Sequence, residues 1–98
     1  MSDISAVITA DDLLAYLGID YADDMVNKNI ANAIAYADGE LRESVGENYP
    51  VDHPLTPELA LLHASASYEK RDLTENEFKR AFQISLKLKL YLSRSAAK

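Results

Sequence analysis

The chain has 98 residues, of which 48% are hydrophobic and none is cysteine, and its formal net charge is −6. This length is enough for one domain, the apolar content is too high for a disordered chain, and the lack of cysteine excludes disulfides, thiolate metal ligands and a cysteine nucleophile. Three glycines and three prolines are few for an all-β domain, which needs many turns.

The first predicted helix is short and has a signal at each end. Thr9 and Asp12 have capping-box spacing, with Asp in place of the usual Glu. Three leucines follow on one helical face, and Gly18 is suited to the left-handed residue that ends a helix. We therefore expect a helix at about Ala10 to Leu17.

The second predicted helix is long. Its apolar residues recur at spacings of three and four: Val26, Ile30, Ala33, Ile34, Ala37, Leu41 and Val45. This is one face of a helix of some 20 residues. Either Asp20 or Asp23 is expected to cap it, with Asp24 at its positive end, and Gly46 to terminate it.

All three prolines fall between residues 50 and 57, which excludes regular structure there. Thr56, Pro57 and Glu58 then read as an N-cap, a first-turn proline and an acid at the positive helix end. The third helix is expected to run from this signal to about Lys70. Its inward-facing residues are expected to be Leu59, Leu62 and Ala66, with His63 as a further candidate.

The fourth segment carries two conflicting patterns. Thr74 and Glu77 form a capping box of the usual type, which predicts a helix that begins at Glu75. Residues 84–92, however, alternate apolar and polar side chains, which is the strand period. Because leucine and lysine favour helix and nothing breaks the chain after Glu75, we favour helix and keep a strand at 84–92 as the alternative.

These signals predict an all-α domain over residues 1–98. A short helix, a long helix and two further helices pack as a small irregular bundle, with a short C-terminal β-strand as the alternative. As a helix, residues 84–92 spread their leucines around much of the circumference, so they need burial on more than one side. We therefore expect residues 75–98 to be an assembly segment.

Charge is divided unevenly along the chain. Residues 1–69 hold 13 acidic side chains against two basic ones, a balance of −11, whereas residues 70–98 have a balance of +5. An acidic body with a basic tail is consistent with a nucleic-acid-binding arm, with complementary surfaces for self-assembly, or with two solvated helix faces.

Candidate chemistry is sparse. Asp20, Asp23 and Asp24 lack the spacing and the glycine of a calcium loop, so we interpret them as caps rather than metal ligands. His53 and His63 are the only histidines, and no nucleophile–base–acid grouping or glycine-rich phosphate loop accompanies them. We expect no enzymatic activity, no catalytic residue, no metal and no cofactor.

The stretch "ITADDLLAYLGIDYADDMVNKNIANAIAYADGELRESVG" resembles the opening of the small head–tail connector proteins of tailed bacteriophages, also called DNA-packaging or head-completion proteins. The family pattern of a capped short helix is matched by Leu13 to Ile19, its acidic turn by residues 20–24, and the end of its long helix by Gly46. A later helix with a charged turn is matched by Thr56 to Arg71. The resemblance covers about residues 7–72; the continuous segment 75–92 departs from it.

The resemblance implies a structural virion protein at the head–tail interface, assembled in the host cytoplasm. Its partners would be further copies in a ring that matches the twelve-fold portal, the portal protein itself, and a tail-side connector or tail protein. DNA would pass through without specific binding, and no membrane is involved: no segment approaches a bilayer span, and the N-terminus is acidic where a signal peptide needs positive charge.

Two functions from different classes therefore remain. The first is the connector ring, with subunit and portal contacts expected on the C-terminal segment. The expected interface residues are Lys79, Arg80, Phe82, Leu86, Lys87, Leu88, Lys89 and Leu90. The alternative is a small DNA-binding regulator that uses the basic C-terminal helix, although the long second helix and the proline-rich loop fit a helix-turn-helix poorly.

Overall fold

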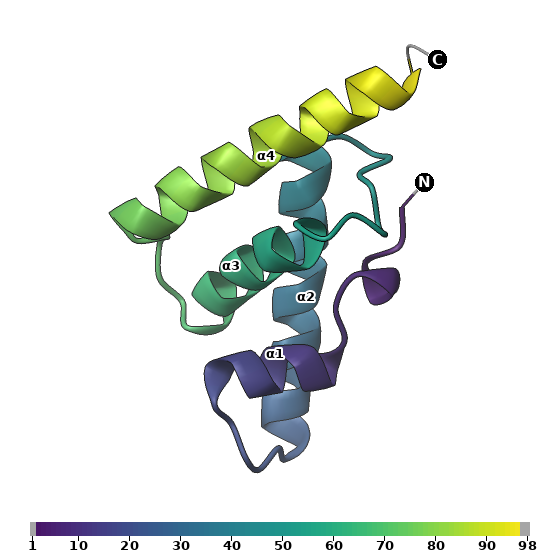
Figure 1. The fold of residues 1–98 in the computed structure, drawn as a ribbon. Helices are drawn as coiled ribbons and strands as arrows, with labels where there is room; N and C mark the ends of the chain where they lie inside the picture. The colour runs from purple at the N-terminus through teal and green to yellow at the C-terminus, as the bar shows by residue number, and fades with distance from the viewer. Residues whose placement is uncertain (1, 97–98) are drawn as a thin grey trace.

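The computed structural model describes residues 2–96 and contains four α-helices and one 3₁₀ turn (Figure 1). The elements are η1 (Ile4–Ala6), α1 (Ala10–Leu17), α2 (Asp24–Ser44), α3 (Thr56–Tyr68) and α4 (Glu75–Ala96). Within residues 2–96 there is no strand, so the predicted all-α class is confirmed.

The strand alternative for residues 84–92 is wrong, because α4 continues through them. Glu77 accepts a hydrogen bond from the Thr74 backbone N–H at 2.9 Å, and Thr74 Oγ1 accepts one from the Glu77 N–H at 3.1 Å. This capping box starts the helix as predicted. In helical geometry the alternating leucines separate, so that Leu88 is buried while Leu86 is 45% exposed.

Helix α1 has the bounds and both end signals that the sequence predicts. Thr9 Oγ1 accepts a hydrogen bond from the Asp12 N–H at 3.2 Å, and the Asp12 carboxylate accepts one from the Thr9 N–H at 2.9 Å. Gly18 ends the helix in the left-handed conformation, with φ of 74°. Leu13 is fully buried, which anchors this short helix to the core.

Helix α2 begins after Asp23, whose carboxylate accepts a hydrogen bond from the Val26 N–H at 2.8 Å. Of the two aspartates that the sequence offered as caps, Asp23 is therefore the cap and Asp20 is not. Asp20 is exposed and lies three residues too early to reach the first turn. The predicted apolar face is confirmed, since Ile30, Ala37 and Leu41 on it are buried.

The predicted N-cap role of Thr56 is wrong. Leu55 occupies the cap position without a side-chain hydrogen bond, and Thr56 is the first residue of α3. Its hydroxyl donates instead to the Pro50 carbonyl oxygen at 2.6 Å, and its side chain is fully buried. Thr56 thus fastens the proline-rich loop to the helix, because a buried hydroxyl needs a partner.

Helix α3 is the centre of the bundle, and α1, α2 and α4 all contact it. It ends at Tyr68, earlier than predicted, and Lys70 adopts a left-handed φ of 54° just beyond it. The buried residues lie on all sides of the helix: Thr56, Leu59, Ala60, Leu62, Ala64, Ser65 and Ala66. Four of these seven side chains are small, namely Ala60, Ala64, Ser65 and Ala66. Burial on all sides is expected for a helix that its neighbours cover all round.

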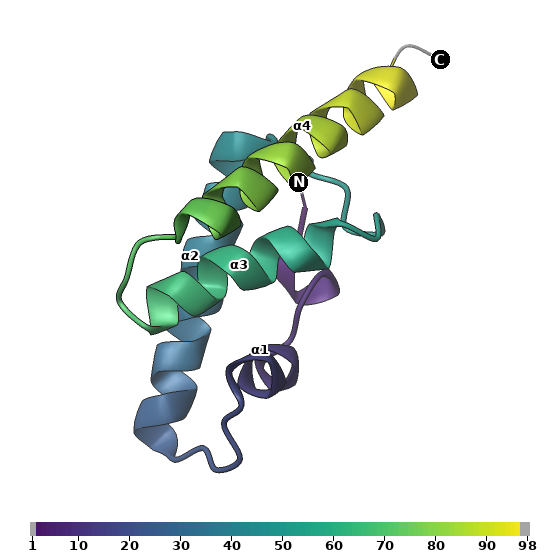
Figure 2. The ribbon, with the colours of Figure 1, turned by 60° about the vertical axis from the view of Figure 1, so that its left-hand side comes forward.

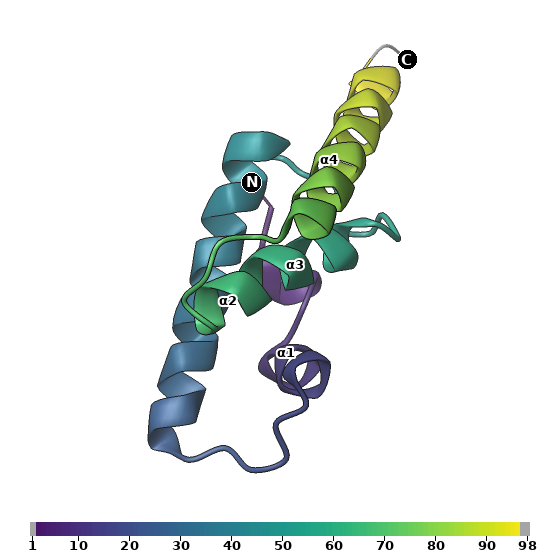
Figure 3. The ribbon, with the colours of Figure 1, turned by 90° about the vertical axis from the view of Figure 1, so that its left-hand side faces the viewer.

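Helix α4 lies over α3 on the side away from α1, as the three views agree (Figures 1, 2 and 3). Its contact with the core is made by Ala81, Ile84, Ser85 and Leu88, which are all buried. At the opposite end of the molecule, the connection between α1 and α2 projects from the bundle (Figure 3). The molecule therefore has two well-separated ends, one formed by α4 and the other by the α1–α2 connection.

Candidate assembly surface

A row of large, partly exposed apolar side chains runs along α4. We call this row the apolar ridge; its members, with their exposed fractions, are Phe78 (62%), Phe82 (57%), Leu86 (45%) and Leu90 (54%). Residues four apart advance by one turn plus about 40°, so the ridge winds slowly around the helix. Such ridges of residues four apart are the surface that a second helix packs into most often.

The same helix is also apolar on its inner side, where Ile84 and Leu88 are fully buried. A helix that is apolar on both sides requires cover on both sides, and within residues 2–96 the chain supplies only one. Of the predicted interface residues, Phe82, Leu86 and Leu90 are accessible. Leu88 is wrong as an interface residue, because it belongs to the core of its own chain.

The predicted basic residues divide into paired and unpaired groups. Arg80 forms two hydrogen bonds with Glu58 of α3, one of them from Nη2 at 2.8 Å, and these bonds lower the pKa of Glu58. Lys79 lies 3.3 Å from Glu75 in an exposed pair, which is weak. Lys87 and Lys89 are exposed and form no ion pair with another described residue. Of these four basic residues, Arg80 is thus the least available to bind another protein chain.

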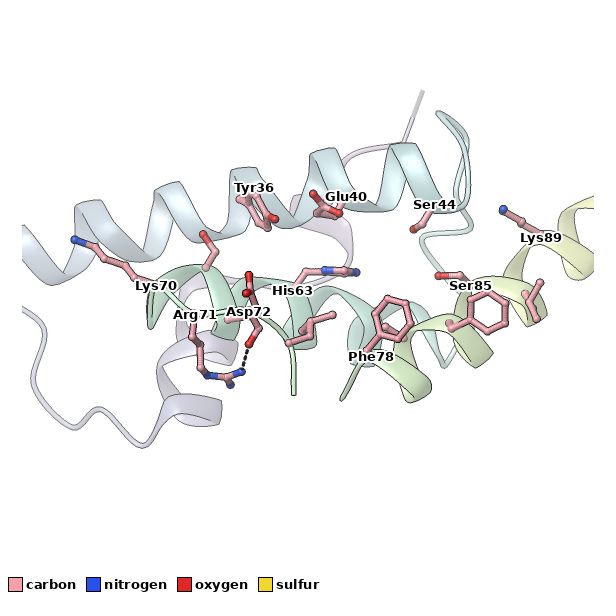
Figure 4. A pocket seen from close by; sticks show the side chains of 16 residues that line it. Tyr36, Glu40, Ser44, His63, Lys70, Arg71, Asp72, Phe78, Ser85 and Lys89 are labelled. Carbon is pink, nitrogen blue, oxygen red and sulfur yellow. Dashed lines mark hydrogen bonds between the residues drawn. The ribbon is translucent and has the colours of Figure 1, made fainter. Parts of the chain in front are cut away.

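A groove of about 820 Å³ lies beside the ridge, between α2, α3 and α4 (Figure 4). Phe78, Phe82 and Leu86 line its α4 side, so the ridge and the groove form one continuous surface. Its other walls carry polar as well as apolar side chains, with Glu40 of α2 and His63 of α3 directed into it (Figure 4). The sequence did not single out this groove, since its residues come from three helices and share no local pattern.

The polar groups of the groove do not form a catalytic arrangement. Burial lowers the pKa of His63, opposed by the charge of Glu40, and no hydrogen bond contributes to that shift. Glu40 also raises the pKa of Tyr36. Ser44 Oγ is buried and has no hydrogen-bond partner among residues 2–96. A nucleophile needs a base within hydrogen-bond reach, and His63 is not linked in this way to any described hydroxyl.

His53 and Asp23, which the sequence analysis considered for catalysis and metal binding, both make contacts within the fold. His53 lies edge-on to Tyr91 with ring centroids 4.9 Å apart, so it joins the proline-rich loop to α4. Asp23 caps α2. Across the described part of the chain, no three or more His, Asp or Glu side chains converge as a metal site would require.

The basic side chains of α4 are spread over more than one side of the helix, and some of them are already paired. Lys87 and Lys89, two positions apart in a helix, point to different sides. Arg71 binds Glu77 and Glu69, and Arg80 binds Glu58, so both guanidinium groups already have carboxylate partners. A phosphate backbone requires several free cations on one surface. Lys87 and Arg94, which lie seven positions apart and line one small pocket, are a smaller set than such a surface requires.

Comparison with protein-family models, with curated proteins and with solved structures finds no match for this chain. None of the helices that the structure describes is sufficiently long and apolar to traverse a bilayer. Among the described residues, the uncovered apolar ridge is the surface feature that most clearly indicates a binding partner.

Proposed function

We propose that this chain is a structural virion protein, a subunit of a head–tail connector ring that forms between the portal and the tail of a bacteriophage. The observation that carries the proposal is the apolar ridge of α4, half-exposed along its whole length. Exposed apolar rows of this size on a small domain are typical of interaction surfaces. The resemblance to connector proteins over residues 7–72 is the reason for proposing a connector ring rather than another assembly.

The energetics favour assembly on a template. Fully burying a large apolar side chain contributes about 1.5–3 kcal/mol, and the four ridge residues are already about half covered. Completing their burial then contributes roughly 1 kcal/mol each, which is comparable with the entropy lost on association. Isolated subunits should therefore associate weakly, whereas a portal that holds several subunits together raises their effective concentration.

The charge distribution is suited to DNA passage. Residues 1–69 have a balance of −11, and acidic side chains that line a channel would repel phosphate groups rather than bind them. In this proposal DNA passes through the ring without specific contacts. The basic residues of α4 then serve protein–protein contacts, where charge pairs set the register more than the affinity.

The test is assembly of the full chain, alone over a range of concentrations and with a purified portal ring, observed by sedimentation and electron microscopy. The double substitution Phe82→Ser and Leu86→Ser should abolish ring formation. Gln83→Ala, an exposed change on the same helix outside the ridge, should leave it intact. Equal assembly by the double variant and the unaltered chain would contradict the proposal. The DNA-binding alternative predicts instead that the full chain binds duplex DNA in a mobility-shift assay at physiological salt. That result would also contradict the proposal.

A further inference from the structure

A second group of exposed apolar side chains lies where α1 passes into α2. Tyr16 is 50% exposed, Tyr21 78% and Met25 65%. Residues 16–25, which contain these three side chains, also include the exposed Asp20 and Asp24. We call residues 16–25 the acidic corner. Single exposed apolar residues are ordinary, but three large ones in one short segment are not needed for solubility or for the core.

The acidic corner and the apolar ridge lie at opposite ends of the molecule. All three views place the α1–α2 connection at one end and α4 at the other (Figures 1, 2 and 3). The chain is elongated, with principal extents of 47, 28 and 19 Å. A subunit therefore cannot cover its own ridge with its own corner, whereas the corner of a neighbour can reach it.

The charges around the two surfaces are complementary. The exposed Lys79, Lys87 and Lys89 border the ridge, and the corner carries Asp20, Asp23 and Asp24. Packing of one α4 against another would bring lysines of both copies together, which is unfavourable. A corner placed on a ridge brings opposite charges together around an apolar centre, the arrangement typical of specific interfaces.

We infer that the acidic corner of one copy of this chain docks on the apolar ridge of the next copy. This inference rests on the proposed function and names the contact that builds the ring. The two surfaces differ, so the interface is heterologous, and each copy offers one surface to each neighbour. Such contacts generate a closed ring or an open filament rather than an isolated pair. The flexible Met25 side chain and the two tyrosines are suited to adaptable packing against phenylalanine.

The absence of cysteine from the sequence allows a direct test by cross-linking. One preparation carries Tyr21→Cys and a second carries Phe82→Cys, both at exposed positions of the full chain. Under mild oxidation at a concentration that permits assembly, the mixture should give disulfide-linked mixed dimers. Each preparation alone should give few, because identical positions do not meet in a heterologous interface. Glu43→Cys, exposed at the other end of α2, replaces Tyr21→Cys as the matched control and should not cross-link.

Charge reversal provides a second measurement that does not depend on disulfide geometry. Asp20→Lys should raise the concentration needed for half-assembly roughly fivefold, the effect expected for loss of a rim charge pair. Combining it with Lys89→Glu in one chain should restore much of that loss. Glu43→Lys makes the same charge change away from the corner and should have no effect on assembly. Asp20 makes no capping bond, so its replacement leaves α2 intact.

The outcomes separate this inference from the proposed function. If ridge substitutions abolish assembly but neither cross-linking nor Asp20→Lys has the expected effect, the corner is not the partner of the ridge and the proposed function stands. If Phe82→Cys alone cross-links as strongly as the mixture, α4 packs on α4 and the inference is overturned. If the full chain assembles neither with itself nor on a portal, both fail.

Discussion

Arg80 and Glu58 join α4 to the first turn of α3, with Nη2 of the guanidinium donating to Oε1 of the carboxylate at 2.8 Å. A second bond from Arg80 Nε completes a forked pair, the geometry for which arginine is best suited. The side chains are 40% and 42% exposed, so the pair is a surface interaction, made between residues 22 positions apart in the sequence. It orients α4, and with it the ridge, relative to the central helix.

Removal of this pair should therefore affect stability modestly. Arg80→Ala should lower the free energy of unfolding by at most about 1 kcal/mol, as expected for an exposed pair. Urea denaturation followed by circular dichroism measures the change. Lys79→Ala, which removes only an exposed i,i+4 pair with Glu75, is the control and should cost less. A loss above 3 kcal/mol would show that Arg80 has a structural role that this geometry does not account for.

Leu88 and Leu86 make a matched pair of substitutions on one helix. Leu88→Ala should cost about 2–5 kcal/mol of stability, because its side chain is fully buried. Leu86→Ala removes a side chain that is 45% exposed and should cost far less stability while weakening assembly. Thermal unfolding and sedimentation of both variants test this separation. Similar stability losses at the two positions would mean that the two faces of α4 are assigned wrongly.

The capping box of α4 makes stability sensitive to acid. Bonds from Arg71 and from the Thr74 N–H lower the pKa of Glu77 from 4.5 to about 2. Because the folded-state pKa is depressed, its contribution is fully present above pH 4.5 and is lost as the pH falls toward 2. Glu77→Gln keeps a capping side chain but removes the charge. The stability difference between the two proteins should shrink over this pH range, and a constant difference would exclude this linkage.

Asp23 and Asp20 should differ in their effect on stability. Asp23→Ala removes the N-cap of α2 and should cost about 1 kcal/mol. Asp20→Ala should change stability by less than about 0.5 kcal/mol, as is usual for an exposed residue outside such features. Thermal unfolding distinguishes the two. The same measurement with added calcium and then chelator should give unchanged midpoints, and a clear rise with calcium would instead indicate a metal site in this turn.

Deletion of residues 84–98 is not a clean test of assembly. Ile84 and Leu88 lie in the deleted segment and are fully buried, so their removal would expose the core around α3. The loss of assembly in such a protein would not distinguish a missing interface from a damaged fold. Substitutions on the ridge avoid this problem because they alter only the uncovered side of α4.

The sequence by itself determined both ends of α1 and the start of α4. Thr9 with Asp12, and Thr74 with Glu77, act across three residues, so the signal for each helix start lies within its own first turn. Apolar spacings of three and four likewise fixed the buried face of α2, because one stripe against one core requires only a local pattern. The absence of any second break after Glu75 was enough to favour one continuous α4.

Only the tertiary structure decided which of several equivalent side chains is used. Asp20 and Asp23 have the same capping chemistry, and the path of the chain places only Asp23 at the helix start. Thr56 looks like a cap until the folded loop brings the Pro50 carbonyl to its hydroxyl. Leu86 and Leu88 are chemically identical, and the position of α3 buries one and leaves the other exposed. These choices depend on contacts between distant segments, which no local pattern encodes.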